Sequence, residues 1–267
     1  MKADGTVNRA ALPAIFNPED LNALEQALKL KDMYPGSKVT VLTMGPARAA
    51  EIVREGLYRG ADGGVVLSDR AFAGSDTLAT SYALSAALRK LGKADIIIGG
   101  RQAIDGDTAQ VGPQVAEKLG LPQVTYAEDI ISADGGKVTV KRRIESGVET
   151  VTAPLPAVIT VNSSAEPCRP RNAKAVMKYK NANVPSEVVG DEKKKELLEK
   201  KPYLQIGEWN AQDVEADLAQ CGLAGSPTKV KQIENIVFVA KEARNIEAED
   251  AALEEFIKEL IANHTIG

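Results

Sequence analysis

The sequence has 267 residues, 44% of them hydrophobic, and a formal net charge of −4; this is enough chain for one large α/β domain with an appendage. The slightly acidic net charge argues against nucleic-acid binding. No apolar run approaches the ~20 residues that a membrane-spanning helix needs. The N-terminus shows no secretory h-region, so we expect a cytoplasmic protein. One histidine, His264, and two distant cysteines, Cys168 and Cys221, argue against histidine catalysis, a metal site or a disulfide framework. Any chemistry is therefore expected to come from a cofactor, with no catalytic side chain and no metal ion.

Helix-like and strand-like segments alternate along the first two thirds of the chain. Helices are expected at 17–32, with Asn17 in position to cap and Pro18 at the first helical position, then over GPARAAEIVREGLYRGAD to near Gly60, at 75–92, and from Gly112-Pro113 onward. Strands are expected at 38–44, 63–69, 94–100, 124–130, 137–144 and 155–162, with a hairpin turn at 133–136. Strands separated by helices of this length form βαβ units, so the predicted fold class is α/β with a mostly parallel, Rossmann-like sheet.

The composition changes after residue 180, so we expect an α/β domain over residues 1–180 and an extension over residues 181–267. Residues 181–202 are polar and charged and predict a linker with one exposed helix. A short strand is expected at 236–242. Residues 247–263 predict an amphipathic helix that docks on its own domain or on a partner, with one apolar face formed by Leu253, Phe256, Ile257, Leu260 and Ile261.

Ligands of parallel α/β sheets bind beyond the carboxyl ends of the strands. The segments expected there, LTMGP, LSDRAFAGSDT and GGRQAIDGDT, are rich in Gly, Ser, Thr and Asp and would share one crevice. In GGRQAIDGDTAQVGP (99–113) a strand end leads into a helix N-terminus, whose N–H groups and dipole favour an anion. Asp105 and Asp107 cannot face a phosphate without repulsion, so they would cap N–H groups, bind ribose hydroxyls, contact a partner's arginine or only shape the loop. No GxGxxG or P-loop pattern is present, and the residues alone predict a nucleotide-type ligand of open identity.

The string GGRQAIDGDTAQVGPQVAEKLGLPQVTY (99–126) closely resembles the signature region of electron transfer flavoprotein β subunits. The stretches NPEDLNALEQALKLKD, KVTVLTMGP, GADGGVVLSDRAFAGSDTLATSYALSAALRK, EPCRPRNAKAVMKYK and GLAGSPTKV resemble the same family in the same order. The resemblance implies a sheet of the adenine-nucleotide α-hydrolase type and a C-terminal arm over an α subunit, in a heterodimer. It also implies a nucleotide in the β subunit, which is AMP in the mitochondrial type and a second FAD in the electron-bifurcating type. Arg101, Gly106, Thr108 and Ala109, together with the small residues of 71–81, resemble the FAD-binding, bifurcating type.

The resemblance also implies which residues bind the cofactor. Thr43, Met44 and Gly45 would lie beside the adenosine half, and Gly100, Asp107, Thr108, Ala109, Gln110 and Val111 would wrap the pyrophosphate, mainly through backbone N–H groups. Ser68, Asp69, Asp76, Thr77 and Thr80 are candidates for ribityl and flavin contacts. Arg101 would balance the pyrophosphate or tune the flavin, or else pair with a surface carboxylate.

The bifurcating type implies that NADH reduces this flavin and that its two electrons are then transferred separately, one to a ferredoxin and one to the FAD of the α subunit. It also implies an acyl-CoA dehydrogenase or a similar enzyme as a redox partner. Two other functions stay open: a non-bifurcating β subunit that binds AMP or is linked to quinone, and a stress-type regulator that binds adenine nucleotides. Family members begin with a further strand before a hairpin resembling KADGT, and this sequence begins at MKADGT. We therefore expect a misassigned start site or a shortened chain, with poor folding or weak nucleotide binding unless the chain is extended.

Overall fold

The computed structural model describes residues 14–228, 243 and 245–266 of the chain. The chain divides into two compact units, one of Asn8–Val230 and one of Met1–Val7 with Lys231–Gly267. The strand expected at 236–242 lies outside the described residues. Of the described elements, only the helix α7 (Asp250–Ala262) belongs to the second unit.

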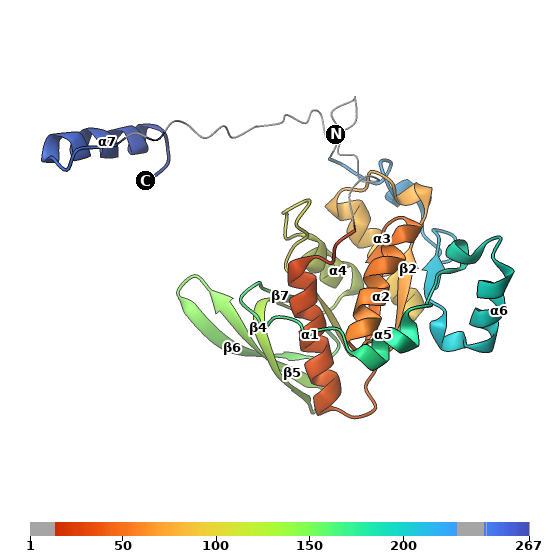
Figure 1. Cartoon of the computed structure of the whole chain (residues 1–267). Helices are drawn as coiled ribbons and strands as arrows, with labels where there is room; N and C mark the ends of the chain where they lie inside the picture. Colours follow the sequence, from red (N-terminus) through yellow and green to blue (C-terminus); the bar gives the residue numbers. More distant parts are fainter. Residues whose placement is uncertain (1–13, 229–242, 244, 267) are drawn as a thin grey trace. The chain divides into compact units, whose positions relative to one another are not determined.

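The strands of the larger unit form two separate sheets (Figure 1). β1 (Thr40–Met44), β2 (Gly63–Leu67) and β8 (Gly207–Trp209) are parallel and lie in the order β1-β2-β8. The second sheet has the order β3 (Ile96–Gly100), β7 (Ala157–Val161), β4 (Gln123–Asp134), β5 (Lys137–Ile144), β6 (Gly147–Pro154). In it, β3 and the start of β4 are parallel to β7, whereas β5 is antiparallel to its neighbours β4 and β6.

The α/β class is therefore confirmed, and most strand pairings are parallel as expected, but the strands form two sheets, one parallel and one mixed, rather than one. β1 and β3 each form the edge of a different sheet, and β4 is long enough to continue from a parallel pairing into an antiparallel one. Apolar and β-branched runs predict where strands form, but they carry no information about which strands exchange hydrogen bonds.

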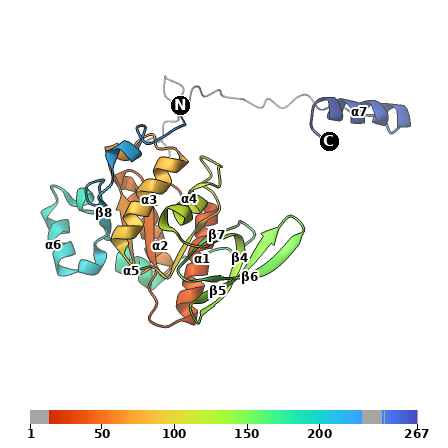
Figure 2. The same ribbon diagram turned by 180° about the vertical axis from the view of Figure 1, so that it is seen from behind.

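Most helices of the larger unit cover the sheets on two sides, and α6 (Glu192–Lys200) lies at the margin (Figures 1 and 2). The others are α1 (Pro18–Met33), α2 (Ala50–Arg59), α3 (Thr77–Leu91), α4 (Val111–Leu119) and α5 (Ala173–Tyr179). α1 packs against β3, β4 and β7, α2 packs against β1, β2 and α5, and α3 packs against α4. The views show α1, α2 and α5 on one side of the sheets and α3 and α4 on the other.

α1 begins where the sequence predicts, but its first turn is used differently. Asn17 precedes the helix in an extended conformation, Pro18 follows it, and Glu19 and Asp20 lie in the first turn, where acidic groups favour the positive end of the helix dipole. The Asn17 side chain makes no capping hydrogen bond to the helix. Its amide donates instead to the Gln102 carbonyl at 2.8 Å, so the helix start is tied to the loop that follows β3.

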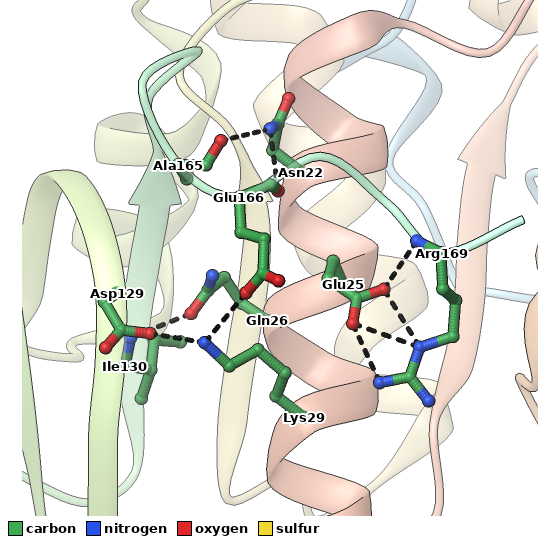
Figure 3. Close-up of polar contacts among 9 residues, drawn as sticks. All are labelled: Asn22, Glu25, Gln26, Lys29, Asp129, Ile130, Ala165, Glu166 and Arg169. Atoms are coloured by element: carbon green, nitrogen blue, oxygen red, sulfur yellow. Dashed lines mark hydrogen bonds and ion pairs between the residues drawn. The ribbon is translucent and has the colours of Figure 1, made fainter.

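A polar cluster fastens the middle of α1 to the segment that leaves β7 (Figure 3). The buried carboxylate of Glu25 accepts the Arg169 backbone N–H at 2.8 Å and its guanidinium N–H groups at 2.8 and 3.0 Å. The Asn22 amide donates to the carbonyls of Ala165 and Glu166 at 2.8 and 2.9 Å. Because a buried carboxylate is stable only with such partners, this segment is held firmly across α1.

The same face of α1 is also fastened to β4 (Figure 3). The Gln26 side chain is fully buried, and its oxygen accepts the Ile130 N–H at 2.8 Å. Lys29 pairs with Asp129 at 2.8 Å and with Glu166 at 3.3 Å. These bonds fix both the position and the rotation of α1, and therefore also the place where its first turn lies.

The sequence predicts a polar linker with one exposed helix over residues 181–202. The structure has that helix, which is α6, but side chains of the same segment also pack on α2. Val184, Val188 and Leu198 are buried in one cluster with Val53 and Leu57 of α2. This segment is therefore part of the packed unit around α2 rather than a free linker. The buried residues stand far apart among charged ones, so the sequence gives no periodic signal for this packing.

α7 has the amphipathic character expected from its sequence. Leu253, Ile257 and Ile261 lie on its apolar face and are 44%, 48% and 53% exposed, and none of the helix residues is buried. No helix among the described residues is both long and apolar enough to cross a membrane.

Candidate functional site

The loop between β3 and α4 presents unused backbone donors at its second half. Asp107 and Ala109 have φ angles of 51° and 53°, a left-handed conformation that is uncommon for residues other than glycine. Gln110 follows in the right-handed region, and such alternation turns successive N–H groups toward one side. Among the described residues, no protein acceptor is found for the N–H groups of Thr108, Ala109, Gln110, Val111 and Gly112.

These donors coincide with the N-terminus of α4, where the helix dipole is positive. Val111 is the first residue of this nine-residue helix, and Gly106 is exposed, with open space where a Cβ atom would lie. Free N–H groups at a helix N-terminus are a suitable environment for a phosphate. The arrangement can therefore hold an anion, as the sequence predicts for this loop.

The N-termini of α3 and α4 meet beside this loop. The Thr77 hydroxyl, in the first turn of α3, donates to the Gln110 side-chain oxygen at 2.9 Å and accepts from the Gln114 amide at 3.4 Å. The other polar atom of the Gln114 side chain, Oε1, is buried without a hydrogen-bond partner among the described residues. Gln114 was not predicted, and its only sequence signal is its position one turn after Gln110. Thr80 lies one turn further along α3 and is half-buried.

The first half of the loop turns toward α1 instead. The Asp20 carboxylate accepts the Gly100 N–H at 2.6 Å, and the Glu19 carboxylate accepts the Gln102 N–H at 3.0 Å. Loss of solvent around its carboxyl group raises the pKa of Asp20, although the hydrogen bonds from Gly100 and Asn17 oppose the shift. The Gly100 N–H is thus already bound to a protein carboxylate, and the unused donors begin later in the loop.

Arg101 and Asp107 have protein partners within or near the loop. Arg101 donates through Nε to Glu19 at 3.2 Å, and its guanidinium lies 5.8 Å from the centre of the Tyr126 ring. The Asp107 carboxylate accepts from the Gln102 side-chain amide. Of the alternatives open for Arg101, the structure shows a pairing with a carboxylate, whose own side chain is 9% exposed.

The two acids after β2 bind backbone N–H groups of the segment 211–228. Asp69 accepts from Ala71 at 2.9 Å and from Ala211 at 3.0 Å, and these bonds lower its pKa. Asp76 caps α3 by accepting from Leu78 and Ala79.

Asp76 also accepts the N–H and the hydroxyl of Thr228 at 3.1 and 2.8 Å. Burial raises the pKa of Asp76, but the combined hydrogen bonds from Ala79, Thr228 and Leu78 outweigh it and leave the pKa below its ordinary value. Both acids thus have clear structural partners.

The ends of β1 and β2 are tied to each other and to β8. Thr43 and Met44 are half-buried at the end of β1, and the Gly45 N–H donates to the Leu67 carbonyl at 3.0 Å. The Ser68 N–H donates to the Trp209 carbonyl at 2.8 Å. No hydrogen bond between described residues joins these strand ends directly to the loop after β3.

A cleft of about 330 Å³ adjoins α3 next to Thr77. It is lined by Leu78 and Tyr82 of α3, Lys118 of α4 and the turn that contains Ser226. The Lys118 ammonium lies 5.8 Å from the centre of the Tyr82 ring. Among the described residues, no group of three His, Cys, Asp or Glu side chains is arranged to hold a metal ion.

Comparison with known proteins connects the chain with a family. Residues 4–191 match the family model of the electron transfer flavoprotein domain. The chain is 46% identical over 234 residues, which are 85% of this chain and 78% of the relative, to the electron transfer flavoprotein subunit beta of Megasphaera elsdenii. It is 43% identical over 227 residues, with the same coverage of 85% and 78%, to the caffeyl-CoA reductase-Etf complex subunit CarD of Acetobacterium woodii. It is 56% identical over 159 residues, 59% of each chain, to the acryloyl-CoA reductase electron transfer subunit gamma of Anaerotignum propionicum. The chain therefore belongs to the electron transfer flavoprotein β-subunit family.

Proposed function

We propose that this chain pairs with an α subunit in a heterodimeric electron transfer flavoprotein and binds FAD where the N-termini of α3 and α4 meet. In this proposal the complex takes electrons from NADH and divides them between a ferredoxin and the FAD of the α subunit. A downstream acyl-CoA dehydrogenase or similar enzyme is supported by two relatives, whose names connect them with a caffeyl-CoA reductase complex and an acryloyl-CoA reductase. The cytoplasmic location and the adenine-nucleotide α-hydrolase type of the sheet stay predictions.

The observation that carries the proposal is the row of unused N–H groups from Thr108 to Gly112 at the start of α4. A pyrophosphate carries several anionic oxygens, and hydrogen bonds to such charged acceptors contribute about 1.5–3 kcal/mol each. The residues present therefore fit the diphosphate part of FAD. The flavin supplies the redox chemistry when bound, and the side chains and backbone of this chain bind and orient it.

FAD is preferred over AMP because of residue size along the loop. Gly106 has no side chain, and Thr108 and Ala109 are small, as in the FAD-binding type that the sequence resembles. AMP in a non-bifurcating complex is the second candidate, because the N–H row would also bind a monophosphate. A self-contained regulator of the stress type is disfavoured by the family match, which covers residues 4–191.

We assign the contact with the α subunit to the region 181–267, including α7. The support is the apolar face of α7, where Leu253, Ile257 and Ile261 remain 44–53% exposed. An apolar stripe of this kind gains free energy when a partner covers it.

The test is to co-express the chain with the product of a neighbouring α-subunit gene, purify the complex and count its nucleotides after denaturation. Two FAD per heterodimer support the proposal, and one FAD with one AMP supports the second candidate. A colourless monomer that binds ATP would contradict both. NADH-dependent reduction of ferredoxin, observed only when the CoA-linked acceptor is present, tests bifurcation itself.

A further inference from the structure

We propose that the start of α1, Asn17 and the first turn that follows it to Asp20, positions the β3–α4 loop for nucleotide binding, and that Asp20 is the central positioning residue. The inference rests on the proposed nucleotide site and deepens it, because it identifies what sets the shape of the loop. These residues lie about 80 positions before the loop in sequence.

The first turn of α1 binds every second backbone N–H at the start of the loop. Asp20 accepts from Gly100 and Glu19 accepts from Gln102, at 2.6 and 3.0 Å. The Asn17 side-chain oxygen accepts from Ile104 at 3.2 Å. Residues 100–104 are therefore held along their length by side chains from a single helical turn.

Asp20 joins the parts of this arrangement. Its Oδ1 atom accepts the Gly100 N–H, and its Oδ2 atom accepts the Asn17 amide at 2.9 Å. The same Asn17 amide also donates to the Gln102 carbonyl at 2.8 Å. One carboxylate thus orients both the strand end and the asparagine that holds the middle of the loop.

The glycine at the strand end permits this close approach. A Cβ atom on Gly100 would lie 2.7 Å from the Asp20 backbone nitrogen and 2.9 Å from the Glu19 Cβ atom, well inside normal contact distance. The helix start and the loop start therefore pack backbone against backbone, which leaves little freedom for the loop to shift along the helix.

This contact divides the loop into two halves with different electrostatics. Residues 100–104 face the carboxylates of Glu19 and Asp20, of which Glu19 is paired with Arg101. An anion is repelled from that half, whereas the N–H groups of 108–112 carry no protein acceptor. Asp20 consequently determines where along the loop a phosphate is bound, and it does so without touching the phosphate.

The test uses Asp20→Asn in the purified heterodimer after removal of its nucleotide. An asparagine keeps an acceptor for Gly100 but turns an N–H group toward the Asn17 amide, so two donors oppose each other and the loop loses its second attachment. We expect binding of added AMP and FAD to weaken at least tenfold, faster amide exchange at residues 100–104, and a melting temperature close to that of the unchanged protein. Asp32→Asn removes the same charge from the same helix, three turns away, and is expected to change affinity less than twofold.

A pH series separates positioning from a general loss of structure. Nucleotide affinity of the unchanged protein should fall as the pH is lowered through the raised pKa of Asp20, and Asp20→Asn should remove that part of the profile. Among the described residues, Glu19 is the neighbouring charged group that acts on Asp20, and Arg101 is paired with Glu19. Glu19→Gln is therefore measured in parallel to assign the titration. If the unchanged complex binds nucleotide tightly and Asp20→Asn binds as tightly with the same profile, this inference alone is overturned. If the unchanged complex binds neither AMP nor FAD, the proposed function fails and this inference fails with it.

Discussion

The Thr77 hydroxyl donates to the Gln110 side chain at 2.9 Å, and this bond joins the N-termini of two helices that follow different strands. Thr77 begins α3, which follows β2, and Gln110 precedes α4, which follows β3. Through the bond, the positive ends of two helix dipoles are held in one place. Anion binding there should therefore depend on a residue that lies outside the anion-binding loop itself.

Replacing Thr77 by valine should weaken nucleotide binding while leaving the fold intact. The change keeps the shape of the side chain and removes the hydrogen bond to Gln110 together with the longer one from Gln114; a neutral hydrogen bond contributes about 0.5–1.5 kcal/mol. We expect a two- to tenfold loss of affinity for FAD or AMP in calorimetric titration. Thr152→Val removes a comparable hydroxyl contact, with Thr139 at 3.3 Å on the distant hairpin, and should leave affinity unchanged. Equal affinities of all three proteins would refute the role of Thr77.

A negative charge at Thr108 should strongly weaken binding of the nucleotide. Thr108 is exposed and begins the row of unused N–H groups, so Thr108→Glu places a carboxylate where the phosphate is expected. Two like charges about 4 Å apart repel by roughly 4 kcal/mol near a protein surface, and we expect at least a tenfold loss of flavin from the purified complex. Thr108→Gln has nearly the same shape without the charge and should retain flavin. Retention of flavin by the glutamate variant would place the phosphate elsewhere.

The sequence predicts those elements whose signal is local. The three isoleucines and two glycines at 96–100 are the strand β3, and Asn17 with Pro18 marks the start of α1 within one residue. The strand β6 was missed because Val148 and Val151 are three positions apart, so the segment lacks the period-two alternation that predicts a half-buried strand. The strand β8 has only three residues and exists because β2 offers it a parallel partner.

The candidate site is less predictable than the fold because its contacts join distant parts of the chain. The donors of 108–112 follow from a loop that leads into a helix, which the sequence shows. That Asp20 binds Gly100, or that Thr77 binds Gln110, depends on the packing of α1 against β3 and of α3 against α4. From hydrophobic periodicity and helix-capping rules alone, Glu19 and Asp20 are predicted only as acidic residues in the first turn of a helix.

A methyl group at Gly112 should disturb the packing of α4 on β7. A Cβ atom there would lie 2.4 Å from the Thr160 Cγ2 atom, so the helix must move or the threonine must turn. Overpacking of this kind costs about 1–3 kcal/mol, which we expect as a lower midpoint of urea unfolding for Gly112→Ala. Thr160→Ser removes the obstructing methyl group, so the double variant should recover most of the lost stability. If the double variant is no more stable than Gly112→Ala, the clash is not the cause.

Removing the guanidinium of Arg169 should destabilise the protein at neutral pH. Arg169→Met leaves Glu25, whose side chain is 7% exposed, as a buried carboxylate without its cation, and we expect a loss of about 2–4 kcal/mol in the free energy of unfolding. The double variant Glu25→Gln with Arg169→Met should recover a large part, because no buried charge is then left unpaired.

The same pair predicts a pH dependence with a definite sign. Burial raises the pKa of Glu25, but the hydrogen bonds and charge of Arg169 lower it by more than burial raises it, so the net shift of the pKa is downward. A lowered folded-state pKa means that the pair stabilises the protein fully above the ordinary glutamate pKa of about 4.3 and loses this effect as the pH falls further. The stability difference between the unchanged protein and Arg169→Met should therefore shrink below about pH 4. A difference that grows on acidification would contradict the assignment.

Cys168 should react slowly with alkylating reagents, although it is only half-buried. Burial, together with the neighbouring Glu25 carboxylate, raises the pKa of the Cys168 thiol to about 11, and only the thiolate is an efficient nucleophile. At pH 8 we expect its iodoacetamide reaction, followed by mass spectrometry of the peptide, to be about a hundredfold slower than that of an ordinary exposed thiol. Glu25→Gln removes the negative charge beside the sulfur and should accelerate the reaction, whereas Asp129→Asn, which changes a carboxylate paired with Lys29 instead, should not. Fast alkylation of the unchanged protein would show that the Cys168 thiol is neither desolvated nor held beside Glu25.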